Sequence, residues 1–306
     1  MKLLTSVASV IALCPIGPAV ECTYAAAHHE YRFHTLDVPA ALGAETSAFG
    51  INNLGVIVGN FVTVDGNFDG FLFKSGSFTD MAVPGASPDD RGALEAVNDA
   101  GLAVGDFIDP NSRIQHMFVR QPRGEISVLA DAASGALLTE GRGINNRGII
   151  VGVYHDAEDN RHGFILHDGV YTRYDYPGAF RTLLTGIDDR GQIIGFWVDT
   201  NRNRHGFLLR DGVTTAIAVP GAVKTTPAGI NNRGQIVGYY DDANGITHGF
   251  MLALGEYTVF DFPGAANTAL LGINDHGIIV GTYDDFSRGL VATPVEEEDD
   301  EAEGGP

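Results

Sequence analysis

The chain has 306 residues, of which 44% are apolar and 40 are glycine, and it carries a formal net charge of −20 at pH 7. The apolar content excludes a chain that is disordered throughout. The acidic balance disfavours nucleic acids and anionic membranes as partners, because both require clustered Lys and Arg.

Residues 1–27 have the pattern of a secretory signal peptide. Lys2 supplies the positive start, residues 3–13 are mostly apolar, and residues 25–27 are small, as at a cleavage site. The apolar stretch is too short to span a bilayer. Both cysteines, Cys14 and Cys22, lie in this segment, so the mature chain is expected to lack disulfides. We therefore expect a secreted monomer, extracellular or periplasmic, without membrane insertion.

A motif close to Gly-Ile-Asn-Asn-x-Gly then recurs along the chain. The last four copies start 43 residues apart, and the first two lie 46 and 47 residues before their successors. A period of about 40–50 residues with short strands is typical of propeller blades or solenoid units. The six copies begin at Gly50, Ala96, Gly143, Gly186, Gly229 and Gly272.

The fifth repeat shows what one unit contains. Its composition predicts strands at residues 228–231, 235–240, 248–252 and 256–262, separated by glycine-containing turns or polar loops. The last of these strands ends at Pro263, which cannot continue a strand pairing. Four strands in one repeat predict a propeller blade.

The chain ends indicate how the ring closes. The last repeat stops before its fourth strand, whereas residues 31–39 resemble the fourth strand of the fifth repeat. We therefore predict an all-β, six-bladed propeller of four-stranded blades over residues 28–294, in which the N-terminal strand completes the last blade and removes an open edge. Residues 295–306 are predicted to form a disordered acidic tail.

Three strings recur in fixed order over residues 31–294: Gly-Ile-Asn-Asn-x-Gly-x-Ile-Val-Gly, His-Gly-Phe and Pro-Gly-Ala. In this the chain resembles the HAF-type repeats of bacterial extracellular proteins. The resemblance implies an exported repeat protein with a poorly defined activity, and it carries over no catalytic residues. The second repeat departs most from the pattern.

Two sets of repeat-equivalent residues are expected to be structural. Histidines before Gly-Phe are expected to hydrogen-bond a neighbouring loop, since ligands on separate blades lie too far apart for one zinc ion; they are His116, His162, His205 and His248. Two rows of large apolar residues are expected to fill the space between blades. They are Phe61, Phe107, Tyr154, Trp197, Tyr240 and Tyr283, and Phe71, Phe118, Phe164, Phe207, Phe250 and Leu290.

Acids in the polar loops leave two interpretations open. They can fix their own loops by accepting backbone hydrogen bonds, or at least one loop can bind calcium. Asp65, Asn67 and Asp69 present oxygen atoms at alternating positions, as the start of a calcium loop does, but no bidentate Glu follows. The acids at one repeat position are Asp109, Asp156, Asp199, Asp242 and Asp285.

The positions five residues before each motif differ between repeats and are predicted to border the channel mouth. Their cations are candidates for holding a carboxylate, phosphate or uronate, the alternative being independent solvated side chains. Trp197, next to a polar loop, is a further candidate for ligand binding. The six positions hold Glu45, Arg91, Leu138, Arg181, Lys224 and Asn267.

The polar loops after the second strand of each repeat and the Pro-Gly-Ala links between repeats are expected on one face, which we call the long-loop face. The repeat regularity favours a non-catalytic protein that binds an extracellular glycan, polymer or protein through this face. The alternative is a metal-assisted hydrolase or lyase acting on a carbohydrate or lactone at the channel, with Glu45, Glu95 and Glu140 as candidate acids and bases. No Gly-x-Ser-x-Gly elbow is present. An enzyme predicts that His, Asp or Glu from different blades converge at one point in the channel.

Overall fold

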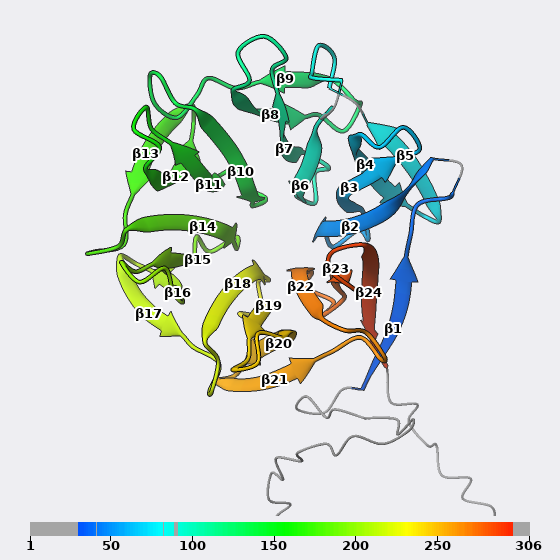
Figure 1. Cartoon of the computed structure of the whole chain (residues 1–306), viewed down its shortest axis with the longest axis vertical. Helices are drawn as coiled ribbons and strands as arrows, with labels where there is room; N and C mark the ends of the chain where they lie inside the picture. Colours follow the sequence, from blue (N-terminus) through cyan, green and yellow to red (C-terminus); the bar gives the residue numbers. More distant parts are fainter. Residues whose placement is uncertain (1–29, 41, 82, 89–90, 296–306) are drawn as a thin grey trace, which may run out of the picture.

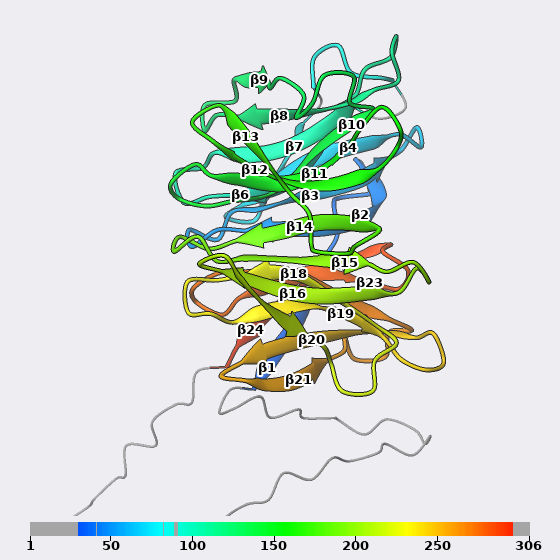
Figure 2. The same cartoon turned by 90° about the vertical axis from the view of Figure 1, so that its left-hand side faces the viewer.

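The computed structural model describes residues 30–295 except 41, 82 and 89–90. The predicted signal peptide, and residues 296–306 of the predicted tail, lie outside the described residues. Six blades surround a central axis (Figure 1). Seen edge-on, the strands run between two faces of the molecule (Figure 2). No helix among the described residues is long and apolar enough to cross a membrane.

We number the blades by their innermost strands. Blade 1 contains β2 (Gly43–Ile51), β3 (Ile57–Thr63), β4 (Phe68–Lys74) and β5 (Ser77–Met81). Blade 2 contains β6 (Ala93–Val97), β7 (Ala103–Ile108), β8 (Gln115–Arg120) and β9 (Ile126–Val128). Blade 3 contains β10 (Leu138–Ile144), β11 (Ile150–His155), β12 (Arg161–His167) and β13 (Val170–Tyr174).

The second half of the ring repeats this plan. Blade 4 contains β14 (Arg181–Ile187), β15 (Ile193–Val198), β16 (Arg204–Arg210) and β17 (Val213–Ile217). Blade 5 contains β18 (Lys224–Ile230), β19 (Ile236–Asp241), β20 (Thr247–Ala253) and β21 (Glu256–Phe260). Blade 6 contains β22 (Thr268–Ile273), β23 (Ile279–Tyr283), β24 (Arg288–Pro294) and β1 (Tyr31–Leu36).

Strand β1 confirms the predicted closure. It pairs antiparallel with β24 from Tyr31 opposite Pro294 to Leu36 opposite Gly289, so the first strand of the described chain supplies the outermost strand of the last blade. The ring of Tyr31 also contacts that of Phe260 in blade 5 at a centroid distance of 4.8 Å. Pairing both chain ends in one sheet covers the edge that an incomplete blade would expose.

The core lies between adjacent blades. Val151 of blade 3, for example, packs with Leu184 and Phe207 of blade 4. Burial of such a side chain stabilises the fold by roughly 1.5–3 kcal/mol, so blade stacking supplies much of the folding free energy. Of the two rows predicted as core, one is fully buried in every blade: Phe71, Phe118, Phe164, Phe207, Phe250 and Leu290. The other row is buried except at Trp197 and Tyr240, which are half-buried.

Every innermost strand carries a β-bulge just before its motif. Between blades 3 and 4 the glycines after the bulge approach closely, because a Cβ on Gly143 would lie 3.0 Å from the Cα of Gly186. A bulge leaves one residue outside the strand pairing and re-aims its side chain. The unpaired residues are Phe49, Glu95, Arg142, Thr185, Ala228 and Leu271.

Candidate functional site

At one end of the channel, the hairpin turns of the six motifs are joined to one another. In blade 3 the side-chain oxygen of Asn145 accepts the backbone N–H groups of Arg147 and Ile149 at 3.1 and 3.0 Å, which fixes the turn. Its amide nitrogen donates to the carbonyl oxygen of Asp188 in blade 4 at 3.0 Å. The same residue therefore shapes its own turn and fastens it to the next blade. Equivalent bonds to the next blade come from Asn52, Asn98, Asn231 and Asn274.

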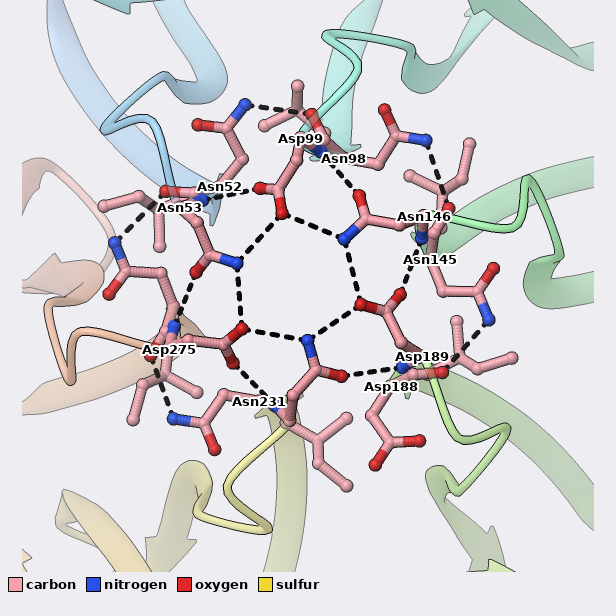
Figure 3. A pocket seen from close by; sticks show the side chains of 18 residues that line it. Asn52, Asn53, Asn98, Asp99, Asn145, Asn146, Asp188, Asp189, Asn231 and Asp275 are labelled. Carbon is pink, nitrogen blue, oxygen red and sulfur yellow. Dashed lines mark hydrogen bonds between the residues drawn. The ribbon is translucent and has the colours of Figure 1, made fainter.

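The residues at the following motif position, the second Asn or Asp, together form a ring around the channel axis (Figure 3). Asparagine and aspartate alternate through the six blades, and each backbone N–H donates to the side-chain Oδ1 of the following blade at 2.7–2.8 Å. Each asparagine amide also donates to both flanking carboxylates at 2.8–2.9 Å. The members are Asn53, Asp99, Asn146, Asp189, Asn232 and Asp275. We call this set the axial ring.

The chemistry of the two side chains requires this alternation. An amide nitrogen has two N–H donors and a carboxylate has none, so each amide is satisfied between two carboxylates. Burial raises the pKa of Asp275, but hydrogen bonds from Asn232 and Asn53 outweigh it and hold that pKa below its usual value. A strict alternation closes only around an even number of blades.

A cavity of about 240 Å³ occupies the channel on the other side of the axial ring. All but two of its lining residues come from the two innermost strands, and the bulged residues supply one side chain from every blade. The Phe286 loop follows the second strand of blade 6, so the cavity opens on the face opposite the hairpin turns. Its lining is Phe49, Glu95, Arg142, Leu183, Thr185, Phe196, Arg204, Thr226, Ala228, Tyr239, Leu271 and Phe286.

One side of this cavity is aromatic and carries backbone strain. Phe286 is 48% exposed and contacts the ring of Tyr239 at a centroid distance of 6.4 Å. Phe286 and the two residues before it, Asp284 and Asp285, all have positive φ angles, of 65°, 50° and 58°. Such left-handed backbone costs roughly 1–2 kcal/mol per residue. Strain of this kind clusters at binding sites, and here it places an aromatic ring at the mouth.

The other side of the cavity is ionic. Arg142 donates to Glu95 of the neighbouring blade at 2.9 Å and to Glu140 of its own blade at 2.5 Å. Burial disfavours the Arg142 cation, but these two carboxylates outweigh it and raise its pKa. Burial raises the pKa of Glu95 against the opposing effect of Arg142. Burial also raises the pKa of Asp106, and the negative charges of Glu140 and Glu95 add to the shift; Asp106 accepts a hydrogen bond from Gln115.

Carboxylates from two blades therefore pair with one arginine at the channel wall. Glu95 and Glu140 are brought together through Arg142, whereas the third candidate, Glu45, does not line the cavity. Glu95 and Arg142 line the cavity, whereas Glu140 and Asp106 do not.

The six positions predicted to border the mouth do not line this cavity. Arg91 pairs with Asp69, Lys224 with Asp241 at 2.9 Å, and Arg181 stacks on Phe180. Asn267 donates to Asp285 at 2.6 Å, and Glu45 has a positive φ of 46°. The prediction missed the wall because the bulge turns the residue directly before each motif toward the axis. Ligand binding by Glu45, Arg91, Arg181, Lys224 and Asn267 stays a prediction.

The residues proposed to hold calcium occupy different environments. Asp65 is exposed in the turn between β3 and β4, and Asn67 is half-buried. Asp69 is fully buried and paired with Arg91, and burial raises its pKa to about 6. Within the described ranges, no group of three or more His, Cys, Asp or Glu is arranged to hold a metal ion. Calcium binding stays a prediction.

Four of the five loop acids, all but Asp285, and the histidines have the predicted structural roles. In blade 3 the carboxylate of Asp156 accepts the backbone N–H groups of Glu158 and Asn160 at 3.0 and 2.8 Å. His162 then bridges Asp156 and Asp175. The corresponding histidines also contact aspartates: His116 contacts Asp131, His205 contacts Asp199, and His248 contacts Asp261.

Trp197 is half-buried and packs against other rings. It stacks between Tyr176, at 4.9 Å, and His205, at 4.3 Å, and packs against the core between blades 3 and 4. Ligand binding by Trp197 stays a prediction.

A scan against protein-family models finds no match, and a search of curated proteins finds none. Solved structures do resemble the chain. A virginiamycin B lyase from Staphylococcus aureus is 14% identical, with 87% of this chain and 100% of that chain covered and a TM-score of 0.51. A gluconolactonase from Xanthomonas campestris is 12% identical, with 92% and 99% covered and a TM-score of 0.53. The SapL1 lectin, in complex with alpha methyl fucoside, is 11% identical, with 79% and 89% covered and a TM-score of 0.51.

At these identities the likeness shows the propeller fold alone. These neighbours include both enzymes and lectins, so the fold is compatible with catalysis and with binding. The assignment of a function to this chain depends on its own cavity.

Proposed function

We propose that the protein is a secreted, non-catalytic propeller that binds one sugar residue of a glycan in the cavity at its long-loop face. The observation that carries the proposal is the divided lining of the cavity, with aromatic and aliphatic side chains on one side and the Glu95–Arg142 ion pair on the other. Secretion rests on the signal-peptide pattern, and the resemblance to HAF-type extracellular repeats supports it.

A sugar has the surface that such a lining complements. Its C–H groups form apolar patches that pack on aromatic rings, while its hydroxyl groups accept and donate hydrogen bonds. Phe286 and Tyr239 offer ring surface, and Glu95 and Arg142 offer an acceptor and donors. The cavity volume of about 240 Å³ lies below the roughly 300–1,000 Å³ of pockets for drug-sized ligands. This size suits a single sugar residue better than a long segment.

The test is a glycan panel measured by isothermal titration calorimetry with a matched pair of variants. Phe286→Ala removes the exposed ring at the mouth, whereas Phe68→Ala removes a ring that is about equally exposed, at 47%, and does not line the cavity. We expect Phe286→Ala to weaken glycan binding about tenfold or more, and Phe68→Ala to leave it unchanged. Equal affinities for the two variants, or no binding by any glycan, would contradict the proposal.

The convergence of acids on Arg142 supports a second candidate, a hydrolase or lyase acting on a carbohydrate or lactone. Glu95 lines the cavity as a candidate base, and Asp106, on which the charge of Glu95 acts, has a raised pKa that favours a retained proton. Glu95→Gln keeps the shape of the side chain and removes the base. Loss of turnover on a carbohydrate or lactone panel in this variant, with glycan affinity retained, would favour catalysis, whereas absence of turnover in the unaltered protein would contradict it.

A further inference from the structure

Three arginines gather beside the cavity on an otherwise acidic protein. Arg181 of β14 lies opposite Val198 of β15, which lies opposite Arg204 of β16, so the two arginines project from the same face of blade 4. Arg204 itself lines the cavity. Arg161 begins the equivalent strand of blade 3 and is close enough to both for their charges to act on it. We call these three residues the arginine cluster.

The arginine cluster lacks the acid that neutralises its counterpart in blade 5. There Lys224 occupies the position of Arg181, and it pairs at 2.9 Å with Asp241 on the adjacent strand. In blade 4 the place of Asp241 is taken by Val198. Among the ion pairs of the described residues, none joins a carboxylate to Arg161, Arg181 or Arg204.

The guanidinium groups are nonetheless held in place. Arg181 lies over the ring of Phe180 at 5.1 Å, and Arg204 lies over the ring of Phe196 at 5.2 Å. Stacking on a ring holds the guanidinium plane and leaves its N–H edge available for a planar, two-oxygen acceptor.

Arg161 provides a separate sign that a partner is missing. Its Nε atom is buried and has no hydrogen-bond partner. Burial lowers the pKa of Arg161, and the positive charges of Arg181 and Arg204 lower it further, against the opposing effect of Asp159 and Glu140. A buried donor without an acceptor, close to like charges, is destabilising by itself. An oxyanion between the three side chains would both accept the hydrogen bond and offset the repulsion.

We propose that the arginine cluster binds the carboxylate of an acidic sugar, a uronate, whose ring occupies the adjoining cavity. The inference rests on the proposed glycan binding and specifies its ligand class. A carboxylate matches guanidinium geometry through paired, charge-assisted hydrogen bonds. A sulfate ester carries a similar oxyanion, and the experiment distinguishes a carboxylate ligand from a sulfate ligand.

The first measurement follows the Nε–Hε signals of ¹⁵N-labelled arginines by NMR. Glucuronate, its neutral methyl ester and glucose 6-sulfate are the probes. We expect glucuronate to shift the signals of Arg161, Arg181 and Arg204 but not that of Arg210, which is exposed and outside the cluster, and to bind about tenfold or more tightly than its ester. Tighter binding of glucose 6-sulfate would overturn the carboxylate assignment, and no selective shift with either anion would overturn the site.

The second measurement uses Arg181→Gln and Arg204→Gln, with Arg210→Gln as the control. Removing one of several like charges should not lower the melting temperature, so a loss of affinity reports on binding rather than folding. We expect about tenfold weaker glucuronate binding for each cluster variant and no change for the control. If acid and ester bind equally and both depend on Phe286, the anion site fails while glycan binding stands. If the arginine signals respond but Phe286→Ala has no effect, the anion site stands and the cavity proposal fails.

Discussion

The two ends of the central channel are built by the same six hairpins, but they follow the repeat to very different degrees. At the axial ring, two residue types alternate without exception, and each side chain satisfies its neighbours on both sides. At the cavity, the six bulged positions hold six different residue types, from phenylalanine and glutamate to alanine and arginine. One end closes the ring of blades, and the other end departs from the repeat.

This difference separates residues that maintain the propeller from residues that distinguish this protein. A hydrogen-bonded ring needs complementary donors and acceptors in every blade, so variation there is costly. The cavity wall makes no such demand, because its side chains face an open space rather than a neighbouring blade. Variation at a position that has the same place in every blade therefore marks the candidate site.

The largest expected effect tests whether the ion pairs at the cavity end of the channel stabilise the fold. Arg142→Met leaves Glu95, Glu140 and Asp106 without their shared cation. Removing one partner of a mostly buried ion pair costs about 3 kcal/mol. We expect a loss of that order in the free energy of unfolding, measured by chemical denaturation. Arg147→Met, on the exposed turn of the same hairpin, should change it by less than about 0.5 kcal/mol; similar losses in the two variants would show that the cluster is not specifically stabilising.

The next effect tests the alternation of the axial ring. Asp189→Asn places three amides in succession, so the donors of Asn146 and Asn232 lose a shared acceptor. Leaving such donors unsatisfied costs about 2 kcal/mol. We expect this loss in denaturant unfolding, against no measurable change for Asp211→Asn on an exposed turn. A ring that tolerates the substitution would show that the alternation is incidental to closure.

The alternation of Asn and Asp is visible in the sequence, but only the structure shows that these side chains hydrogen-bond to one another around the channel axis. The period and the turn chemistry predict the blades and the strand that closes them, because these follow from local composition. The residues of the cavity wall were not predicted. The positions five residues before each motif were predicted to border the channel, whereas the wall is formed by the residue directly before each motif. A β-bulge turns Glu95 and Arg142 toward the axis, and no composition rule for the inner strand indicates a bulge there. The variation in residue type directly before each motif was the signal in the sequence that could have indicated the cavity wall.

A smaller effect concerns blade 4, in which the first Asn of the repeated motif is replaced by Asp. Asp188 stands where the other five blades have asparagine, and its Oδ2 atom is buried without a hydrogen-bond partner, with the Nε atom of the exposed Arg190 at 3.6 Å. Asp188→Asn would supply an amide that donates to the carbonyl oxygen of Asn231. One such bond contributes about 1 kcal/mol, so we expect the melting temperature to rise by about 2 °C. An unchanged or lower melting temperature would show that the aspartate is already satisfied.

The pH dependence of the increase in melting temperature tests whether the ionised carboxylate of Asp188 is its cause. Burial raises the pKa of Asp188 above its unfolded value, so the folded state binds the extra proton and its stability falls as pH rises from about 4 through the folded pKa. The variant lacks this group. Its advantage should therefore be largest at pH 7 and shrink toward pH 4, where a protonated Asp188 donates as an amide does.

Comparing the two proteins at each pH removes the other titrations. Asp275 has a lowered pKa and contributes stability above about pH 4, with the opposite sign to Asp188, but it is present in both chains and cancels in the difference. The same holds for Asp106 and its raised pKa. A difference in melting temperature that stays constant from pH 4 to 7 would mean that Asp188 is ionised throughout, and that the repeat position accepts a charge next to the axial ring.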